Sequence, residues 1–105
     1  MIKKFDPVIK VKSDNLHIDE IGDWGENKYK IVGHYCNIFT GSMYKKWKRL
    51  VYIDLFSGCG YSRITSSNKI IMGSPLISLS INKLFTDYIF IESDNAKFEA
   101  LNERV

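Results

Sequence analysis

The chain has 105 residues, of which 45% are hydrophobic and 26% charged, with a formal net charge of +3. These values are typical of one small globular domain, and the charge alone does not indicate a nucleic-acid-binding protein. The two cysteines exclude a disulfide framework, and without a CxxC or Cys/His cluster at ligand spacing we expect no metal site. No apolar run is long enough to span a membrane and no signal-peptide pattern is present, so a cytoplasmic protein is expected.

Residues 1–49 form the first predicted segment, which shows little periodicity before residue 26. Residues 8–11 alternate between apolar and polar, and they predict a short edge strand that follows Pro7. Trp24 lies in a glycine-rich break and is predicted to be a packing anchor, with a ligand-stacking role as the alternative.

A helix is predicted over residues 26–40, because apolar residues recur there at helical spacing. The predicted buried face consists of Val32, Tyr35, Cys36 and Phe39. Cys36 is therefore expected to be a small core residue. His34 has no second ligand at a suitable spacing, and a surface position is expected for it.

One basic cluster follows this helix, with aromatic residues among the cations. Its members are Lys45, Lys46, Lys48 and Arg49, with Trp47 between them. Such a cluster can contact a phosphate backbone while the aromatic ring stacks or packs. The alternative, which we favour, is a solvated connector whose cations lie near a helix C-terminus.

Residues 50–55 form a short apolar run, rich in β-branched and aromatic residues, that predicts a buried strand. It begins the second predicted segment, residues 50–105. The strand ends near Asp54, and a turn containing Gly58 and Gly60 follows it. Glycines allow a tight turn and a close ligand approach, and open α/β sheets bind nucleotide-like ligands at the carboxyl ends of their strands. The alternative is a tight turn that binds no ligand.

Residues 61–72 are predicted to be a long loop over the ligand crevice. Ser74 is predicted to cap a helix that has Pro75 at its first position and runs to about Phe85. The free N–H groups of this helix would point toward the crevice.

A second apolar strand is predicted over residues 88–92, and it ends in Glu92. Two apolar runs joined by a helix predict a parallel sheet that is covered on both faces. Glu92 could accept the ribose hydroxyls of an adenosine-containing cofactor, or it could instead belong to the capped start of the next helix. Asp94 is predicted to cap a last helix over residues 95–105.

The glycine loop, with its pattern Asp54-x-Phe56-x-Gly58-x-Gly60, resembles the first motif of S-adenosylmethionine-dependent methyltransferases. Several further positions are similar to those of the three-Cys-motif partner protein family: Asp14, Leu16, Gly22, Trp24, Lys28, Tyr35, Phe39, Tyr52, Ile53, Gly73, Ser74, Pro75, Leu76, Phe90, Ile91 and Glu92. The resemblance covers most of the chain. It implies a Rossmann-like sheet, S-adenosylmethionine as cofactor and a companion protein with three cysteines, but it implies no particular methyl acceptor.

The resemblance also implies roles for residues of the loop. Gly58 and Gly60 would let the backbone reach the methionine moiety, with Phe56 and Ser57 beside them. Asp54 would bind the ammonium group, directly or through water, and Glu92 would hold the ribose. No catalytic pair is recognisable, but methyl transfer depends more on orientation and a dry site than on an acid–base pair.

The chain departs from the family pattern in two places. Cys59 stands where relatives often have proline, which is expected to change only the stiffness of the loop. The sequence ends at Val105 inside a predicted helix, after about half of a doubly wound fold. We therefore expect a truncated or fragmentary chain.

Three other functions are considered. A cytosine-type DNA methyltransferase fragment fits the loop, but such enzymes use a cysteine on a Pro-Cys pair that this chain lacks. A non-catalytic module could use the same fold to bind the companion protein, or nucleic acid through the basic cluster. A nicotinamide dehydrogenase fits less well, because Arg63 replaces the third glycine of its fingerprint.

Overall fold

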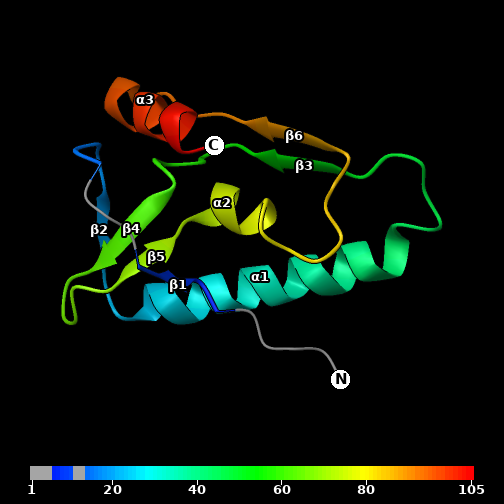
Figure 1. Cartoon of the computed structure of the whole chain (residues 1–105), viewed down its shortest axis with the longest axis horizontal. Helices are drawn as coiled ribbons and strands as arrows, with labels where there is room; N and C mark the ends of the chain where they lie inside the picture. The colour runs from blue at the N-terminus through cyan, green and yellow to red at the C-terminus, as the bar shows by residue number, and fades with distance from the viewer. Residues whose placement is uncertain (1–5, 11–13) are drawn as a thin grey trace.

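The computed structural model describes residues 6–10 and 14–105, which form six strands and three helices (Figure 1). The strands are β1 (Val8–Ile9), β2 (Asp19–Ile21), β3 (Val51–Asp54), β4 (Tyr61–Ile64), β5 (Ile70–Met72) and β6 (Asp87–Phe90). The helices are α1 (Trp24–Met43), α2 (Ser74–Ser78) and α3 (Asn95–Arg104). The chain is thus mixed α/β, as predicted.

The strands form two separate sheets. β3 and β6 form a parallel pair in which Asp54 lies opposite Phe90, and this pairing confirms the two predicted apolar strands. The other sheet has the order β1-β5-β4-β2 and is mixed, because only β2 and β4 run parallel. The predicted parallel sheet is therefore present only in part within the described residues. Strands from both predicted segments, residues 1–49 and 50–105, share the mixed sheet.

The segment between residues 61 and 72 is a β-hairpin, and the prediction of a long loop there was wrong. β4 and β5 pair antiparallel, and the turn between them contains Asn68 with a φ of 57°. Side chains alternate in burial along β4, where Ser62 and Ile64 point inward. The buried Ser62 concealed this alternation, because a strand is recognised in sequence by apolar rather than small polar inward residues.

The long helix α1 starts earlier and ends later than predicted, so that Gly41 lies inside it. Cys36 is buried in a core with Leu50 and Phe85, as predicted. Trp24 is 67% exposed, so the prediction that it is a packing anchor was wrong. Tyr35 is also largely exposed.

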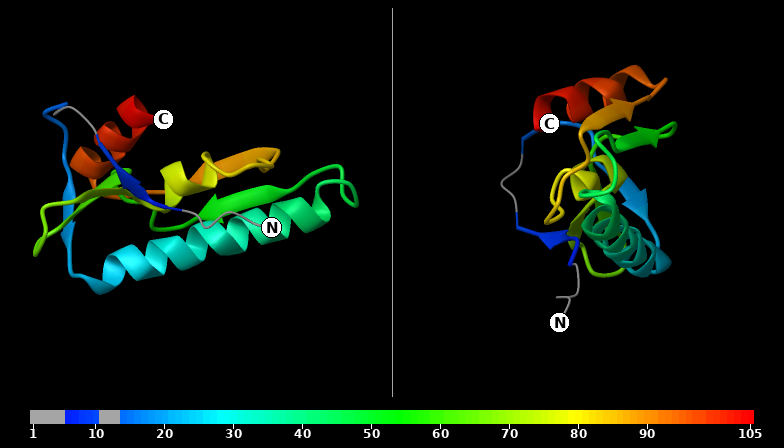
Figure 2. Two further views of the ribbon diagram at one scale, coloured as in Figure 1. Left: turned by 60° about the horizontal axis from the view of Figure 1, so that its bottom comes forward. Right: turned by 90° about the vertical axis from the view of Figure 1, so that its right-hand side faces the viewer.

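Helix α2 ends at Ser78 instead of continuing to Phe85, and its N-cap residue is Gly73 instead of Ser74. The hydroxyl of Ser78 donates to the carbonyl of Pro75 at 2.7 Å, and the hydroxyl of Ser80 donates to a carbonyl four residues earlier. Serine side chains that bond the backbone compete with helix propagation, which accounts for the early end. α2 packs against α1 and contacts β3 (Figure 1), and Figure 2 shows these elements from two further directions.

The β3–β6 pair is covered on one face only. Tyr52 and Tyr88 point to the core under this pair. On the opposite face Ile53 is 58% exposed, and Val51 and Ile89 are also exposed. The prediction that both faces are covered was therefore wrong for the described residues. Among those residues, no helix is both long and apolar enough to cross a membrane.

Helix α3 begins as predicted. The carboxylate of Asp94 accepts a hydrogen bond from the backbone N–H of Lys97 at 3.0 Å. This helix packs near the glycine loop, because a Cβ atom added to Gly60 would lie 3.4 Å from a side-chain carbon of Leu101.

Candidate functional site

The candidate site is the loop that follows β3 at the carboxyl edge of the parallel pair. Gly58 and Gly60 have φ angles of +74° and +97°, which other residues rarely adopt. Gly60 also lies close to Leu76 of α2, where a Cβ atom would be 3.4 Å from a leucine carbon. The sequence therefore correctly located a turn that requires glycine.

Asp54 ends β3 and accepts three polar contacts. Its Oδ1 accepts a bond from the backbone N–H of Phe56 at 3.3 Å. Its Oδ2 accepts from the Tyr52 hydroxyl at 3.4 Å and from the Ser74 hydroxyl. Burial, and then the charge of Asp54, raise the pKa of Tyr52, so this phenol stays protonated and remains a donor.

Glu92 follows β6 and bonds directly to the glycine loop. Its Oε1 accepts from the backbone N–H of Gly58 at 2.9 Å, and its Oε2 accepts from the N–H of Asp94 at 3.0 Å. The two predicted carboxylates, Asp54 and Glu92, therefore lie at the same edge of the β3–β6 pair. Glu92 also accepts from the N–H of Asp94 at the start of α3, in agreement with the alternative interpretation, whereas its role toward a ribose stays a prediction.

The other two loop residues differ in position. Ser57 is buried, and its N–H and hydroxyl donate to the carbonyl of Ile91 at 3.1 and 3.2 Å. Phe56 is 90% exposed. Ser57 thus ties the loop to β6, whereas Phe56 projects away from the contacts that join the strands.

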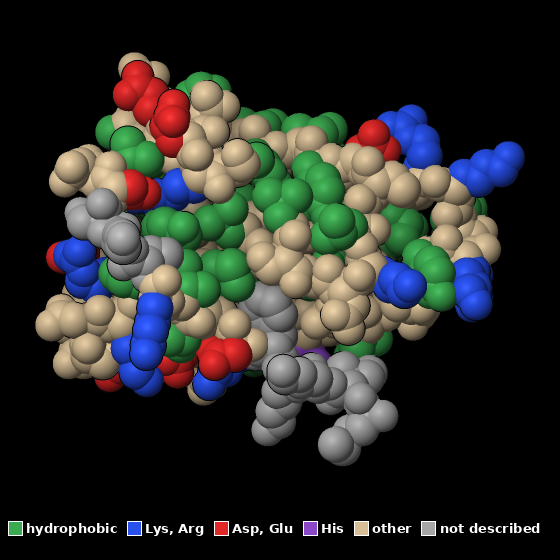
Figure 3. Space-filling model, in the orientation of Figure 1, with side chains coloured by type: hydrophobic (Ala, Val, Ile, Leu, Met, Phe, Trp, Pro, Cys, Tyr) green, Lys and Arg blue, Asp and Glu red, His purple; other side chains and the backbone are tan. Residues whose placement is uncertain are grey.

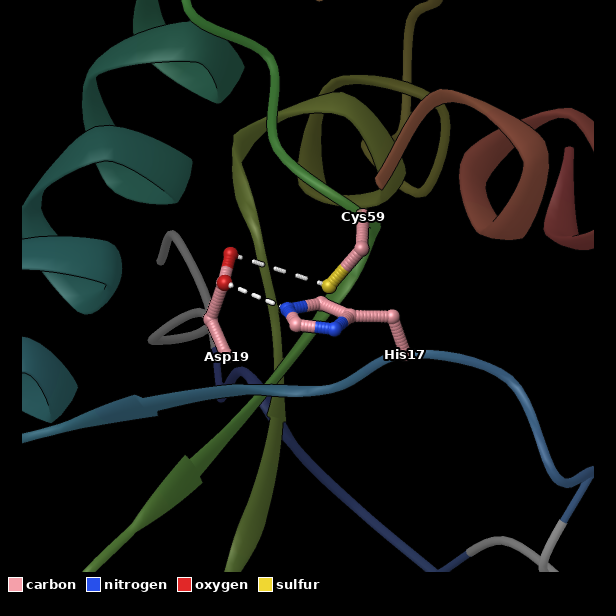
Figure 4. Close-up of side chains that lie close together, drawn as sticks. All are labelled: His17, Asp19 and Cys59. Atoms are coloured by element: carbon pink, nitrogen blue, oxygen red, sulfur yellow. Dashed lines mark hydrogen bonds and ion pairs between the residues drawn. The ribbon is translucent and has the colours of Figure 1, made fainter. Parts of the chain in front are cut away.

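A second cluster, absent from the sequence prediction, includes a side chain of the same loop (Figure 4). It consists of His17, Asp19 and Cys59, whose ligand atoms all lie within 4.8 Å of one another. Asp19 Oδ1 lies 3.1 Å from His17 Nε2, and Oδ2 lies 3.7 Å from Cys59 Sγ. Lys97 Nζ also approaches Asp19 Oδ1, at 3.3 Å. Burial, and then the charge of Asp19, raise the pKa of the Cys59 thiol.

Arg104 of α3 holds this region together, although no sequence pattern pointed to it. Its side chain is 2% exposed and makes two bonds of 2.9 Å to the carboxylate of Asp14. It also donates to the backbone carbonyls of His17 at 2.6 Å and Cys59 at 2.8 Å. The bond from Arg104 lowers the pKa of Asp14 to about 2.

Two cavities in the described part of the chain lie apart from the glycine loop, and one of them borders Arg104 and Asp14. A cavity of about 470 Å³ is lined by apolar residues of α1 and its core neighbours, among them Val32, Cys36 and Tyr52. Another, of about 580 Å³, lies between α3 and the segment around Asp14. The glycine loop lines neither of these two cavities.

The basic cluster lies after the end of α1, where Lys and Arg side chains gather at one end of the molecule (Figure 3). Its four cations, Lys45, Lys46, Lys48 and Arg49, are exposed. Arg49 pairs with Asp87 at 3.0 Å. Trp47 is 64% exposed. The structure thus leaves the aromatic ring and all four cations at the surface, with Arg49 in an exposed ion pair.

In comparisons with protein-family models, curated proteins and solved structures, no match to this chain was found.

Proposed function

We propose that the chain is the cofactor-binding portion of an S-adenosylmethionine-dependent methyltransferase-like protein, similar to three-Cys-motif partner proteins. The observation that supports this proposal best is the 2.9 Å bond between Gly58 N–H and Glu92. It places a positive-φ glycine turn beside the carboxylate that follows the adjacent parallel strand, and in Rossmann-like sheets a glycine turn and an acidic residue at such positions contact the cofactor.

The chemistry of the loop residues suits this ligand. Asp54 supplies a carboxylate for the ammonium group of the methionine moiety. Each carboxylate oxygen of Glu92 has two lone pairs, so its two backbone bonds leave capacity for two ribose hydroxyls. The exposed ring of Phe56 is available to cover a bound cofactor.

Calorimetric titration with S-adenosylmethionine and S-adenosylhomocysteine tests the proposal. Glu92→Ala should weaken binding about tenfold or more, because it removes the carboxylate that would accept the ribose hydroxyls. Gly58→Val should weaken binding by a similar factor, because its side chain would block the approach of the ligand to the loop backbone. Gly41→Ala and Glu99→Ala are the matched controls, because both residues are exposed and distant from the loop in sequence. Absence of binding by a chain that circular dichroism shows to be folded would contradict the proposal.

A second candidate function is binding of nucleic acid through the basic cluster. The exposed Trp47 among cations favours it, since aromatic rings stack on bases while cations contact phosphates. Reversing Lys45 and Lys46 to glutamate should weaken binding to single-stranded nucleic acid at low salt, whereas Lys10→Glu should not. Unchanged binding would remove this candidate and leave the companion protein with three cysteines as the partner of a non-catalytic module.

The cytosine-type DNA methyltransferase fragment remains a weaker alternative. Its nucleophile would have to be an accessible cysteine in the pocket that receives the flipped base. Cys59 is 1% exposed, and its thiol lies 3.1 Å from the carbonyl of Tyr61. Neither feature favours attack on a base.

A further inference from the structure

We propose that His17, Asp19 and Cys59 form a binding site for a divalent transition-metal ion of the Zn²⁺ type. The cluster joins β2 and the segment before it to the glycine loop, about forty residues later in the chain. The proposal does not depend on the proposed cofactor function, because it uses the Cys59 side chain and not the loop backbone.

The donor atoms lie close enough together for small side-chain shifts to give tetrahedral coordination. For Zn–N and Zn–O bonds near 2.1 Å and a Zn–S bond near 2.3 Å, the donors should lie about 3.4 Å (N···O) and about 3.6 Å (S···O) apart. The observed separations involve the two oxygens of the Asp19 carboxylate, with 3.1 Å from Oδ1 to His17 Nε2 and 3.7 Å from Oδ2 to Cys59 Sγ, and one ligand atom from each residue lies within 4.8 Å of the other two. His17 is exposed, so its ring can adjust the remaining distance to the sulfur.

The hydrogen bonding of Cys59 also favours a cation. A thiol has one proton, yet Cys59 Sγ lies 3.1 Å from the Tyr61 carbonyl and 3.7 Å from the Asp19 carboxylate. One of these two oxygens therefore faces a sulfur lone pair instead of a donor. A cation between the sulfur and the carboxylate would convert this contact between acceptors into two coordination bonds.

The donor types indicate which metal binds. A thiolate with an imidazole selects a softer divalent ion over Mg²⁺ or Ca²⁺, which prefer oxygen ligands. Binding releases the thiol proton to solvent, and the charges of Cys59 and Asp19 then balance the metal charge. Three protein ligands leave a fourth position for water.

The site is held in place before any metal binds. Arg104 donates to the carbonyls of both His17 and Cys59, so one buried side chain fixes the backbone of two ligands. Lys97 would compete with a metal ion, because its ammonium group forms an ion pair with the Asp19 carboxylate.

Titration of the full chain with Co²⁺, followed by displacement with Zn²⁺, tests the proposal. We expect visible bands of tetrahedral cobalt together with thiolate-to-cobalt charge-transfer absorption, both removed by Zn²⁺. Cys59→Ser should abolish the charge-transfer absorption, whereas Cys36→Ser, which changes the other cysteine, should retain it. His17→Ala should weaken binding at least about tenfold, and His34→Ala should not.

Two further measurements keep the test decisive. His17 is exposed, so His17→Ala should fold, as circular dichroism will check, even where Cys59→Ser does not. Lys97→Met should tighten metal binding, because it removes the competing cation from Asp19. An octahedral cobalt spectrum without charge transfer, equal binding by His17→Ala, or loss of the signal in a Cys36→Ser variant that circular dichroism shows to be folded would overturn the proposal.

Discussion

Arg104→Met is expected to be among the most destabilising single substitutions in this chain. Methionine replaces the aliphatic stem of arginine but removes two bonds to the Asp14 carboxylate and two to backbone carbonyls. The Asp14 carboxylate is partly exposed and can be solvated, so the main cost is the loss of the donor to the carbonyls of His17 and Cys59, which is about 1–3 kcal/mol. The whole domain is expected to be stable by about 5–15 kcal/mol, so this loss is a large fraction of its stability.

Urea unfolding followed by far-ultraviolet circular dichroism measures this loss. Tryptophan fluorescence is less suitable, because Trp24 and Trp47 are already exposed in the folded chain. The matched control is Arg63→Met, since Arg63 makes a longer, exposed pair with Glu20 at 3.7 Å and should contribute less than about 1 kcal/mol. The reasoning would be refuted if Arg104→Met lost less than about 1 kcal/mol of unfolding free energy while the slope of that free energy against urea concentration stayed the same.

Three further predictions concern glycine geometry, a helix cap and acid stability. Gly60→Ala should destabilise the chain by about 1–3 kcal/mol in chemical unfolding because of its positive φ, whereas Gly41→Ala, inside α1 with open space around it, should stabilise by about 0.5–1 kcal/mol. Asp94→Ala should cost about 0.5–2 kcal/mol in the same assay by removing the cap of α3, and no loss would contradict the cap. The pKa of Asp14 is lowered from 3.8 to about 2, so its stabilisation is fully present above about pH 4 and is lost as the pH falls through 2. Melting temperatures of wild type and Asp14→Asn should therefore converge as the pH approaches 2, and a constant difference would exclude this linkage.

Local signals predicted much of the fold. β3 and β6 were located because short apolar runs ended at turn residues, and α3 because Asp94 caps it through a bond three residues away. The glycine turn and both carboxylates also came from local sequence. The predicted site residues Asp54, Gly58 and Glu92 do lie at one edge of the parallel pair.

Long-range pairing accounts for what the sequence did not predict. β2 contains two acidic residues in three and has little strand propensity by itself, yet it pairs with β4 through a parallel register. This pairing brings Asp19 to Cys59, and a bond across 90 residues brings Arg104 to Asp14. Because no local pattern encodes such contacts, a search for metal-ligand spacing along the sequence could not find the cluster.

The glycine loop presents different groups to its two sides. With positive φ at both Gly58 and Gly60, the backbone N–H of Gly58 points to Glu92 while the side chain of Cys59 points to Asp19. The proposed cofactor contacts therefore use main-chain and strand-end groups, and the proposed metal contacts use side chains of β2 and the loop. A chain that binds cobalt through Cys59 but no S-adenosylmethionine would refute the first proposal and leave the second intact, and the reverse result would separate them equally well.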